Sequence, residues 1–234
     1  MKCITWNCNG AFRKKHHTLD ELSPDLVIIQ ECENPELSGK LFQDWAKSGD
    51  HLWKGDNKNK GIGVFARTGL SLRPLDWPDD WLQSFLPFRV NGHINMVGVW
   101  TKENSSPTFK YIGQFWKYLQ KNKERLACES VVICGDFNSN KRWDVWDRWW
   151  NHSDVVRELE KIGVVSLYHK LHGEPQGEES QPTLYLHRKL TRPYHVDYAF
   201  ASERLCDGAE ISVGQAHQWL EYSDHTPIVF DLPI

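Results

Sequence analysis

The 234-residue sequence lacks the patterns typical of disulfide scaffolds, zinc sites and membrane spans. Its six cysteines are scattered, with no CxxC pair and no spacing of zinc ligands. No apolar run approaches the ~18 residues of a membrane-spanning helix. The opening MKCITWNCNG has neither the apolar stretch nor the cleavage site of a signal peptide. We therefore expect free thiols in a reducing compartment, no membrane partner and a cytoplasmic protein.

Neither sign of charge dominates, because 28 Lys and Arg oppose 31 Asp and Glu for a net charge of −3. A module that coats nucleic acid needs clustered Lys and Arg, so this balance disfavours a pure nucleic-acid-binding protein. It does not disfavour an enzyme, since a cation bound to carboxylates reverses the local charge and can hold phosphate. No GxSxG turn is present, which disfavours a metal-free serine hydrolase.

The length fits one domain over residues 1–234, and a core of this size needs no disulfide or structural metal. No internal repeat or low-complexity tract divides the chain. Twelve tryptophans are present, four of them clustered as Trp143, Trp146, Trp149 and Trp150. Such rings could stack on nucleic-acid bases, but packing within the protein is the favoured interpretation, because aromatic side chains dominate core burial.

Short apolar segments bounded by Gly, Pro, Asn and Asp predict a strand-rich fold. Strands are expected over residues 2–6, 26–29, 61–66, 70–75, 84–90, 94–100, 130–134, 196–201, 209–213 and 228–232. Helical spacing predicts helices over residues 15–22, 35–47, 109–119 and 155–162. The segment GEPQGEES at residues 173–180 is polar and rich in Gly and Pro, which predicts a surface excursion.

Polar residues recur where the predicted strands end. Alone, each has an ordinary explanation as a turn or cap residue. Together they suggest a site, because open sheets place ligands just beyond strand ends. The set comprises Asn7, Glu31, Asp136, Asn138, Asp197, Asp224 and His225.

Metal-assisted phosphodiester hydrolysis needs side chains of these types. Mg²⁺ prefers oxygen ligands and is commonly held by one or two carboxylates plus substrate phosphate. Asp136 could orient or deprotonate the attacking water while Asn138 fixes its position. A histidine can stabilise charge on a phosphoryl oxygen, and a second acid bonded to it would hold its tautomer.

Five motifs in order along the chain carry a family resemblance. They are Trp6-Asn7-Cys8-Asn9-Gly10, Gln30-Glu31, Gly135-Asp136-Phe137-Asn138, Val196-Asp197-Tyr198 and Ser223-Asp224-His225. On these motifs the sequence resembles the endonuclease/exonuclease/phosphatase superfamily, which includes deoxyribonuclease I, exonuclease III and apurinic endonucleases. The resemblance implies a four-layer α/β sandwich, in which two packed, mostly antiparallel β-sheets are flanked by helices. It also implies one or two divalent cations, Mg²⁺ or Mn²⁺.

Carried over by motif, the resemblance assigns metal binding to Glu31, helped by Asn9 and Asp224. Asn7 would contact the substrate phosphate or order the site.

The same resemblance assigns the nucleophilic water to Asp136 and Asn138. Asp197 would pair with His225, which would contact the scissile phosphate as general acid/base or charge stabiliser.

Two features depart from the family pattern. Relatives often present Tyr or His where this chain has Trp100-Thr101, and Trp offers neither a hydroxyl nor an acceptor. A basic residue often precedes the position of Asp197, whereas this chain has His195, with Arg192 nearby. His195 and Arg192 are therefore candidate phosphate contacts, and Arg192 belongs to a basic patch with Arg188 and Lys189 that could equally be an ordinary solvated loop.

A nuclease with DNA as its partner is the first choice, since the chain has the length of a bare exonuclease III-like core. An inositol polyphosphate phosphatase is disfavoured because Tyr194-His195-Val196-Asp197 replaces the Trp-Cys-Asp-Arg signature of that branch. A sphingomyelinase-type lipid hydrolase is disfavoured because the opening residues do not have the pattern of a signal peptide. The alternatives that stay open are a phosphatase or phosphodiesterase acting on a small molecule, and an inactive nucleic-acid-binding relative. No protein partner is predicted.

Overall fold

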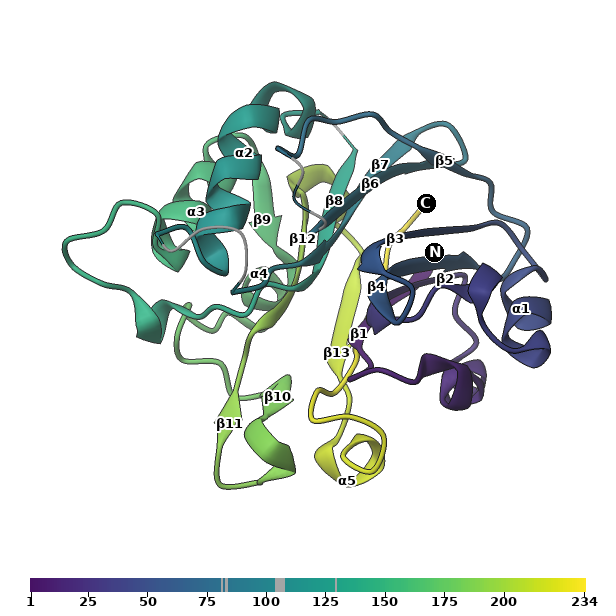
Figure 1. The fold of residues 1–234 in the computed structure, drawn as a ribbon. Helices are drawn as coiled ribbons and strands as arrows, with labels where there is room; N and C mark the ends of the chain where they lie inside the picture. The colour runs from purple at the N-terminus through teal and green to yellow at the C-terminus, as the bar shows by residue number, and fades with distance from the viewer. Residues whose placement is uncertain (81, 83, 104–107, 129) are drawn as a thin grey trace.

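A computed structural model describes residues 1–80, 82, 84–103, 108–128 and 130–234 of the chain. Two six-stranded β-sheets pack face to face, and helices cover their outer faces (Figure 1). The four-layer α/β sandwich expected from the sequence is therefore confirmed.

The first sheet contains both the first and the last strand of the chain. In spatial order its strands are β13 (Glu210–Val213), β14 (Ile228–Asp231), β1 (Lys2–Asn7), β2 (Leu26–Cys32), β4 (Lys60–Ala66) and β3 (His51–Asn57). The central pair β1–β2 is parallel and the flanking pairs are antiparallel.

The second sheet is built by the middle of the chain. In spatial order its strands are β5 (Leu72–Pro74), β6 (Phe85–Val90), β7 (Ile94–Trp100), β8 (Val131–Asp136), β12 (Asp197–Ser202) and β9 (Val164–Ser166). Only β7–β8 is parallel among its pairs. A separate hairpin of β10 (Leu184–Tyr185) and β11 (Pro193–Tyr194) projects beyond the sheets (Figure 1).

Helical segments lie outside the sheets. The α-helices are α1 (Lys40–Ala46), α2 (Ile112–Leu126), α3 (His152–Glu160), α4 (Leu167–His172) and α5 (Ala216–Trp219). The 3-10 helices are η1 (Phe12–Lys14), η2 (His16–Leu22), η3 (Pro35–Leu37), η4 (Lys141–Trp143), η5 (Leu186–Arg188) and η6 (Glu203–Leu205). Among the described residues, no helix combines the length and apolar character that crossing a membrane requires.

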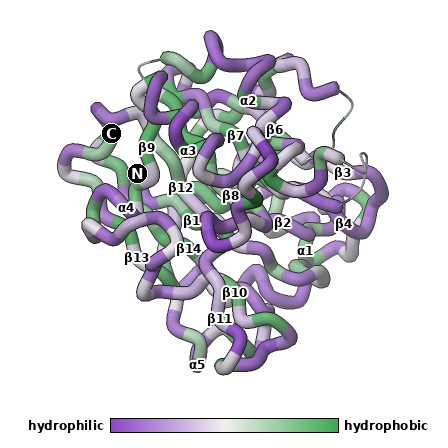
Figure 2. Tube along the Cα trace, turned by 90° about the vertical axis from the view of Figure 1, so that its left-hand side faces the viewer, coloured by the Kyte–Doolittle hydropathy of each residue, from purple (hydrophilic) through white to green (hydrophobic). Residues whose placement is uncertain are grey.

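Three buried clusters separate the four layers. The central cluster joins the facing sides of the two sheets, for example Ile28 and Val64 of the first with Met96 and Val132 of the second. A second cluster packs α2 and α3 on the outer face of the second sheet. A third packs η1, η2 and α1 on the outer face of the first. In Figure 2, hydrophilic stretches dominate the outer connections, as this layering requires.

The structure differs from the sequence prediction mainly at helix boundaries and at weak strands. The predicted helix 109–119 begins later, at Ile112, because Tyr111 has a left-handed φ of 49°, and it continues to Leu126. Residues 15–22 form a 3-10 helix, and 35–47 divide into η3 and α1. The strands β3, β9, β10 and β11 were not predicted, because they are short or mix charged residues with apolar ones.

Gly135 is the position where the backbone near the end of β8 tolerates no side chain. Its φ is 142°, and a Cβ added there would lie 2.0 Å from the carbonyl oxygen of Val99 on β7. That backbone oxygen cannot move without disturbing the β7–β8 pairing. The glycine therefore permits the close strand approach that precedes Asp136.

We expect Gly135→Ala to lower the free energy of unfolding by more than about 3 kcal/mol, because backbone strain and steric overlap combine. Gly69→Ala is the matched control, since Gly69 also has a positive φ but no atom within 4 Å of the position that a Cβ would take. Gly69→Ala should lower the free energy of unfolding by about 1 kcal/mol. Urea denaturation measures both values, and equal losses would contradict the steric explanation.

Candidate active site

The two central strands of the first sheet bring Asn7 and Glu31 together. Asn7 is the last residue of β1, and its register partner on the parallel strand β2 is Gln30. Glu31 follows in a β-bulge, with a left-handed φ of 59°. Asn7 Nδ2 lies 3.4 Å from Glu31 Oε1. Bulges re-aim side chains, and this one turns a carboxylate toward the end of β1.

The second sheet contributes two acids that face each other. Asp136 ends β8, and its register partner is Asp197, the first residue of the antiparallel strand β12. The expectation of polar residues at strand ends is wrong for Asp224 and His225, which precede β14. It is also wrong for Asp197, which begins β12 as the predicted strand 196–201 implies. Asp197 stands at the same edge of the sheet as Asp136 because its strand runs in the opposite direction.

A hydrogen bond between side chains connects the two sheets at this edge. Asn7 Nδ2 donates to Asp136 Oδ2 at 2.9 Å. Asn138, with a left-handed φ of 46°, donates to the same carboxylate from its backbone nitrogen at 2.8 Å and from Nδ2 at 3.0 Å. Asp136 is fully buried, so these donors replace the water that its charge has lost.

Burial, together with the negative charge of Asp197, raises the pKa of Asp136 to about 7. The positive charge of His225 and the hydrogen bonds from Asn7 and Asn138 act in the opposite direction and keep the rise limited. A carboxylate with a pKa near neutrality can accept a proton from water more readily than an ordinary one.

The loop before β14 brings His225 beside Asp197. His225 Nδ1 and Asp197 Oδ2 are 2.8 Å apart, and both side chains are buried. Ser223 fixes this loop, because its hydroxyl donates to the carbonyl of Asn7 and accepts from the backbone nitrogen of His225. The indole of Trp6 donates to the carbonyl of His225 at 2.9 Å.

Burial alone lowers the pKa of His225, but the charges of Asp197, Asp136 and Asp224 and the hydrogen bond to Asp197 raise it to about 10. This raised pKa favours the charged form of the ring, in which Nδ1 donates to Asp197. Nε2 is then the nitrogen that can donate to a substrate.

Two groups of side chains could hold a cation. Ligand atoms of Asp136, Asp197 and His225 lie within 4.8 Å of one another, and Asp197 Oδ1 is buried without a hydrogen-bond partner among the described residues. A metal at this group would have to displace the proton that the surrounding carboxylates favour on His225. The second group is Glu31, Asn9 and Asp224, which offers carboxylate and amide oxygens at the more open rim. Asn9 Nδ2 donates to Asp224 Oδ1 at 3.0 Å, which places these two side chains together.

The two further predicted phosphate contacts, His195 and Arg192, differ in their exposure to solvent. His195 is 3% exposed, its Nδ1 donates to the carbonyl of Gln181, and its ring packs against Tyr168 and Tyr198. This burial argues against direct contact with a phosphate. Arg192 is exposed in the β10–β11 connection, while the guanidinium of Arg188 donates to the carbonyls of Glu221 and Tyr222.

Trp100, which stands where relatives often present Tyr or His, is 8% exposed and belongs to the central core. The following residue has a structural role instead. The Thr101 carbonyl accepts from Asn138 Nδ2 at 3.0 Å, and its backbone nitrogen donates to the carbonyl of Asp136. The Thr101 hydroxyl is buried and donates to the carbonyl of Phe137, so this strand end supports the neighbouring site residues rather than offering a hydroxyl to a substrate.

Two residues of the site were missed by sequence reasoning. Thr183 Oγ1 accepts from the backbone nitrogens of Val196 and Asp197, which fixes the start of β12. Lys60 Nζ lies 2.5 Å from Glu31 Oε2. Neither carries a sequence signal, because a threonine in a polar loop and a lysine at a hairpin are ordinary in those places.

The predicted surface loop 173–180 folds inward at one point. The Glu179 side chain is 2% exposed and accepts from His169 and from the backbone nitrogen of Gly177. Gln176 reaches the buried ring of His152. The loop is exposed at Gly173, Pro175, Glu178 and Ser180, as a surface excursion should be, but it also completes a buried polar network beside β12.

The tryptophan cluster divides between packing and exposure. Trp150 packs against Phe109, with ring centroids 4.7 Å apart, as the favoured interpretation requires. Trp143 packs against Tyr194 at 5.3 Å and is 44% exposed. Trp149 contacts Trp150 edge to face at 4.7 Å but is 65% exposed. Trp146 is 96% exposed, so packing within the chain does not explain Trp146.

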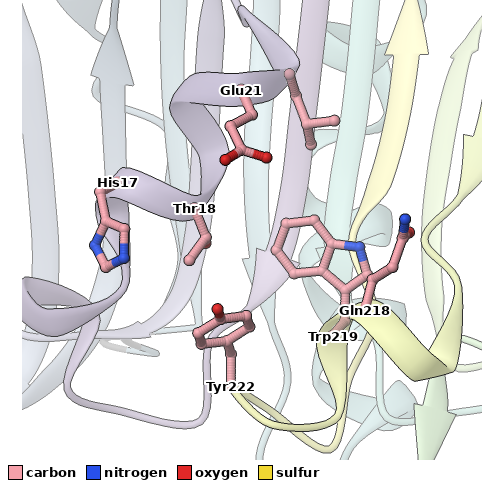
Figure 3. Close-up of a pocket in the computed structure, with 7 residues that line it drawn as sticks. His17, Thr18, Glu21, Gln218, Trp219 and Tyr222 are labelled. Carbon is pink, nitrogen blue, oxygen red and sulfur yellow. The ribbon is translucent and has the colours of Figure 1, made fainter.

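A pocket of about 390 Å³ lies apart from the predicted site residues, between η2 and the segment around α5 (Figure 3). It is lined by His17, Thr18, Glu21, Leu22, Gln218, Trp219 and Tyr222. Only one carboxylate is among them, so this pocket lacks the clustered acids that the predicted chemistry needs.

The family model described as the Endonuclease/Exonuclease/phosphatase family matches residues 4–225. The chain belongs to this family. The match spans every site residue from Asn7 to His225, so the whole of the edge described above lies within the family's region of the chain. No curated protein is similar enough in sequence to count as a match.

Solved structures of other proteins share this fold. The 3'-5' exonuclease NExo from Neisseria meningitidis is 17% identical with a TM-score of 0.71, and 99% of each chain is covered. The 3' phosphatase NExo from Neisseria, bound to a product DNA hairpin, is 18% identical with a TM-score of 0.70 and full coverage of both chains. An AP endonuclease from Archaeoglobus fulgidus is 21% identical with a TM-score of 0.66, again with full coverage of both.

The buried network beside β12 should make stability depend on pH. Burial lowers the pKa of His152 to about 4, although hydrogen bonding to Gln176 opposes the shift. The unfolded chain, with a histidine pKa of about 6.5, then binds more protons than the folded chain between these values. Stability is therefore full above about pH 6.5 and falls as the pH falls toward 4.

We expect His152 to account for a loss of up to about 3 kcal/mol across this window. Chemical denaturation at several pH values measures it, and His152→Gln should make the pH dependence shallower. The exposed His217→Gln is the control. An unchanged slope in His152→Gln would show that other groups cause the loss.

Proposed function

We propose that the protein is a divalent-metal-dependent hydrolase of nucleic-acid phosphodiester bonds, with residues 1–234 acting as one catalytic domain. The observation that carries the proposal is the meeting of Asn7, Glu31, Asp136, Asp197 and His225 at one edge shared by both sheets. These residues lie up to 218 positions apart in sequence, yet each is joined to at least one other by a hydrogen bond or by strand pairing.

We assign the metal to Glu31, with Asn9 and Asp224 as further ligands, and expect Mg²⁺ or Mn²⁺ because all three offer oxygen atoms. When bound, such a cation supplies positive charge that neutralises the scissile phosphate. Asn7 donates hydrogen bonds toward both Glu31 and Asp136, which holds the metal-binding and water-binding halves of the site in register.

Asp136 is the proposed base for the attacking water. Its carboxylate is held from three directions by Asn7 and by the backbone and side chain of Asn138. A fixed carboxylate with a pKa near 7 can take the proton of a water placed in line with the phosphorus.

His225 is the proposed donor to the phosphate. Asp197 keeps the imidazolium oriented through Nδ1, so that Nε2 donates to a phosphoryl oxygen as negative charge develops there. The same proton can pass to the leaving oxygen.

DNA is the favoured substrate because the structural relatives described by their names as a 3'-5' exonuclease and an AP endonuclease share the complete fold. One relative is named as a 3' phosphatase with bound product DNA, which makes a terminal phosphate on DNA the second candidate. An exposed Arg192 and the exposed rings of Trp146 and Trp149 offer contacts outside the site.

Purified protein should cleave labelled DNA with Mg²⁺ or Mn²⁺ and lose that activity with EDTA. Glu31→Gln removes a metal ligand and His225→Ala removes the phosphate donor, so each should lower kcat by about 10²- to 10⁴-fold. Single-stranded, double-stranded, abasic and 3'-phosphorylated DNA are compared with RNA. Product lengths separate internal cleavage from removal of terminal groups.

Glu178→Gln is the control, because this glutamate is exposed on the 173–180 loop and should leave kcat unchanged. Circular dichroism establishes that each variant is folded. Folded wild-type protein that hydrolyses none of these polymers would refute the nuclease proposal and direct the search to small phosphorylated molecules.

A further inference from the structure

Lys60 places a positive charge on the proposed metal ligand. It is the first residue of β4, at the end of the β3–β4 hairpin, and its Nζ lies 2.5 Å from Glu31 Oε2. The Lys60 side chain is 49% exposed, whereas the Glu31 side chain is 18% exposed. The ammonium therefore approaches the carboxylate from the solvent side, where a cation would enter.

Both oxygens of Glu31 are engaged by this chain. Oε2 accepts from Lys60, and Oε1 faces the amide of Asn7 at 3.4 Å. A divalent cation that binds Glu31 must share Oε2 with the ammonium or displace it. Two cations close to one carboxylate repel each other, so Lys60 and the metal compete.

A nearby ion pair shows what a purely structural pair looks like in this fold. Arg13 pairs with Glu33, which is 5% exposed and also accepts from the backbone nitrogens of Phe12 and Arg13. That carboxylate is fixed by several donors from one segment. Lys60 instead makes one contact with the Glu31 carboxylate through a long, half-exposed side chain. Such a side chain can leave the carboxylate without disturbing the fold.

We infer that Lys60 is a built-in competitor for the metal at Glu31. In the metal-free protein it neutralises Glu31 and holds its carboxylate in place. On metal binding it withdraws toward solvent, where the backbone phosphates of a substrate offer it another partner. The site therefore binds the metal weakly when no substrate is present and more tightly when substrate is bound. This inference rests on the proposed function.

Isothermal titration calorimetry of the full chain with Mn²⁺ alone measures the affinity for the metal, so it tests the competition without relying on activity. Lys60→Gln removes the charge and should bind Mn²⁺ about tenfold more tightly than wild type. Lys60→Arg keeps a positive charge and should stay within about twofold of wild type. Lys58→Gln is the matched control from the same hairpin, because Lys58 is exposed and forms no ion pair within the described part of the chain. It should also match wild type.

Glu31→Gln separates this inference from the proposed function. Tighter binding by Lys60→Gln that disappears in the Lys60→Gln/Glu31→Gln double variant supports competition at Glu31. Equal or weaker binding by Lys60→Gln, with wild-type binding still lost in Glu31→Gln, overturns the role of Lys60 and leaves the metal site standing. No Mn²⁺ binding by wild type or by Lys60→Gln overturns the metal-dependent function and the inference together.

Discussion

The packing of the two sheets on each other decides where every polar residue of the site lies. Gly98 of β7 permits close approach, because a Cβ there would lie 3.1 Å from methyl groups of Ile28 and Ile62 on the opposite sheet. Each sheet then supplies half of the site along one shared edge. The hydrogen bond from Asn7 to Asp136 crosses the boundary between them, so a displacement of one sheet would separate the proposed metal ligand Glu31 from the proposed base Asp136.

The second constraint is charge. Burying several carboxylates together is costly unless each has a compensating partner. Here the compensation is graded: His225 neutralises Asp197 deep in the fold, amide donors serve Asp136 beside it, and Lys60 serves Glu31 at the rim. The partners of Asp197 and Asp136 are fixed by the fold, at the place of the proposed chemistry. The partner of Glu31 can exchange, at the place where the proposed metal ion would enter.

Apolar runs bounded by turn residues are local signals, so they predicted most of the strands, whereas the four layers were predicted from the family resemblance. The sequence also identified Asp136 and His225 as residues that belong together, but only through motif resemblance, since spacing does not show convergence. The predicted strand 196–201 placed Asp197 near its start, but the sequence could not show that antiparallel pairing with β8 sets Asp197 opposite Asp136. The burial of His195 and the contact of Lys60 with Glu31 arise from tertiary packing between distant segments, for which no local pattern exists.

The place of β1 within its sheet has a consequence for translation. This first strand lies between β2 and β14, and β14 ends at Asp231. During synthesis, β1 therefore lacks one neighbour, and Asp197 lacks its histidine, until nearly all of the described residues have been made. For the proposed nuclease, catalytic competence arrives only after His225 and β14 have left the ribosome, so nucleic acid around a translating ribosome never meets a prematurely active enzyme.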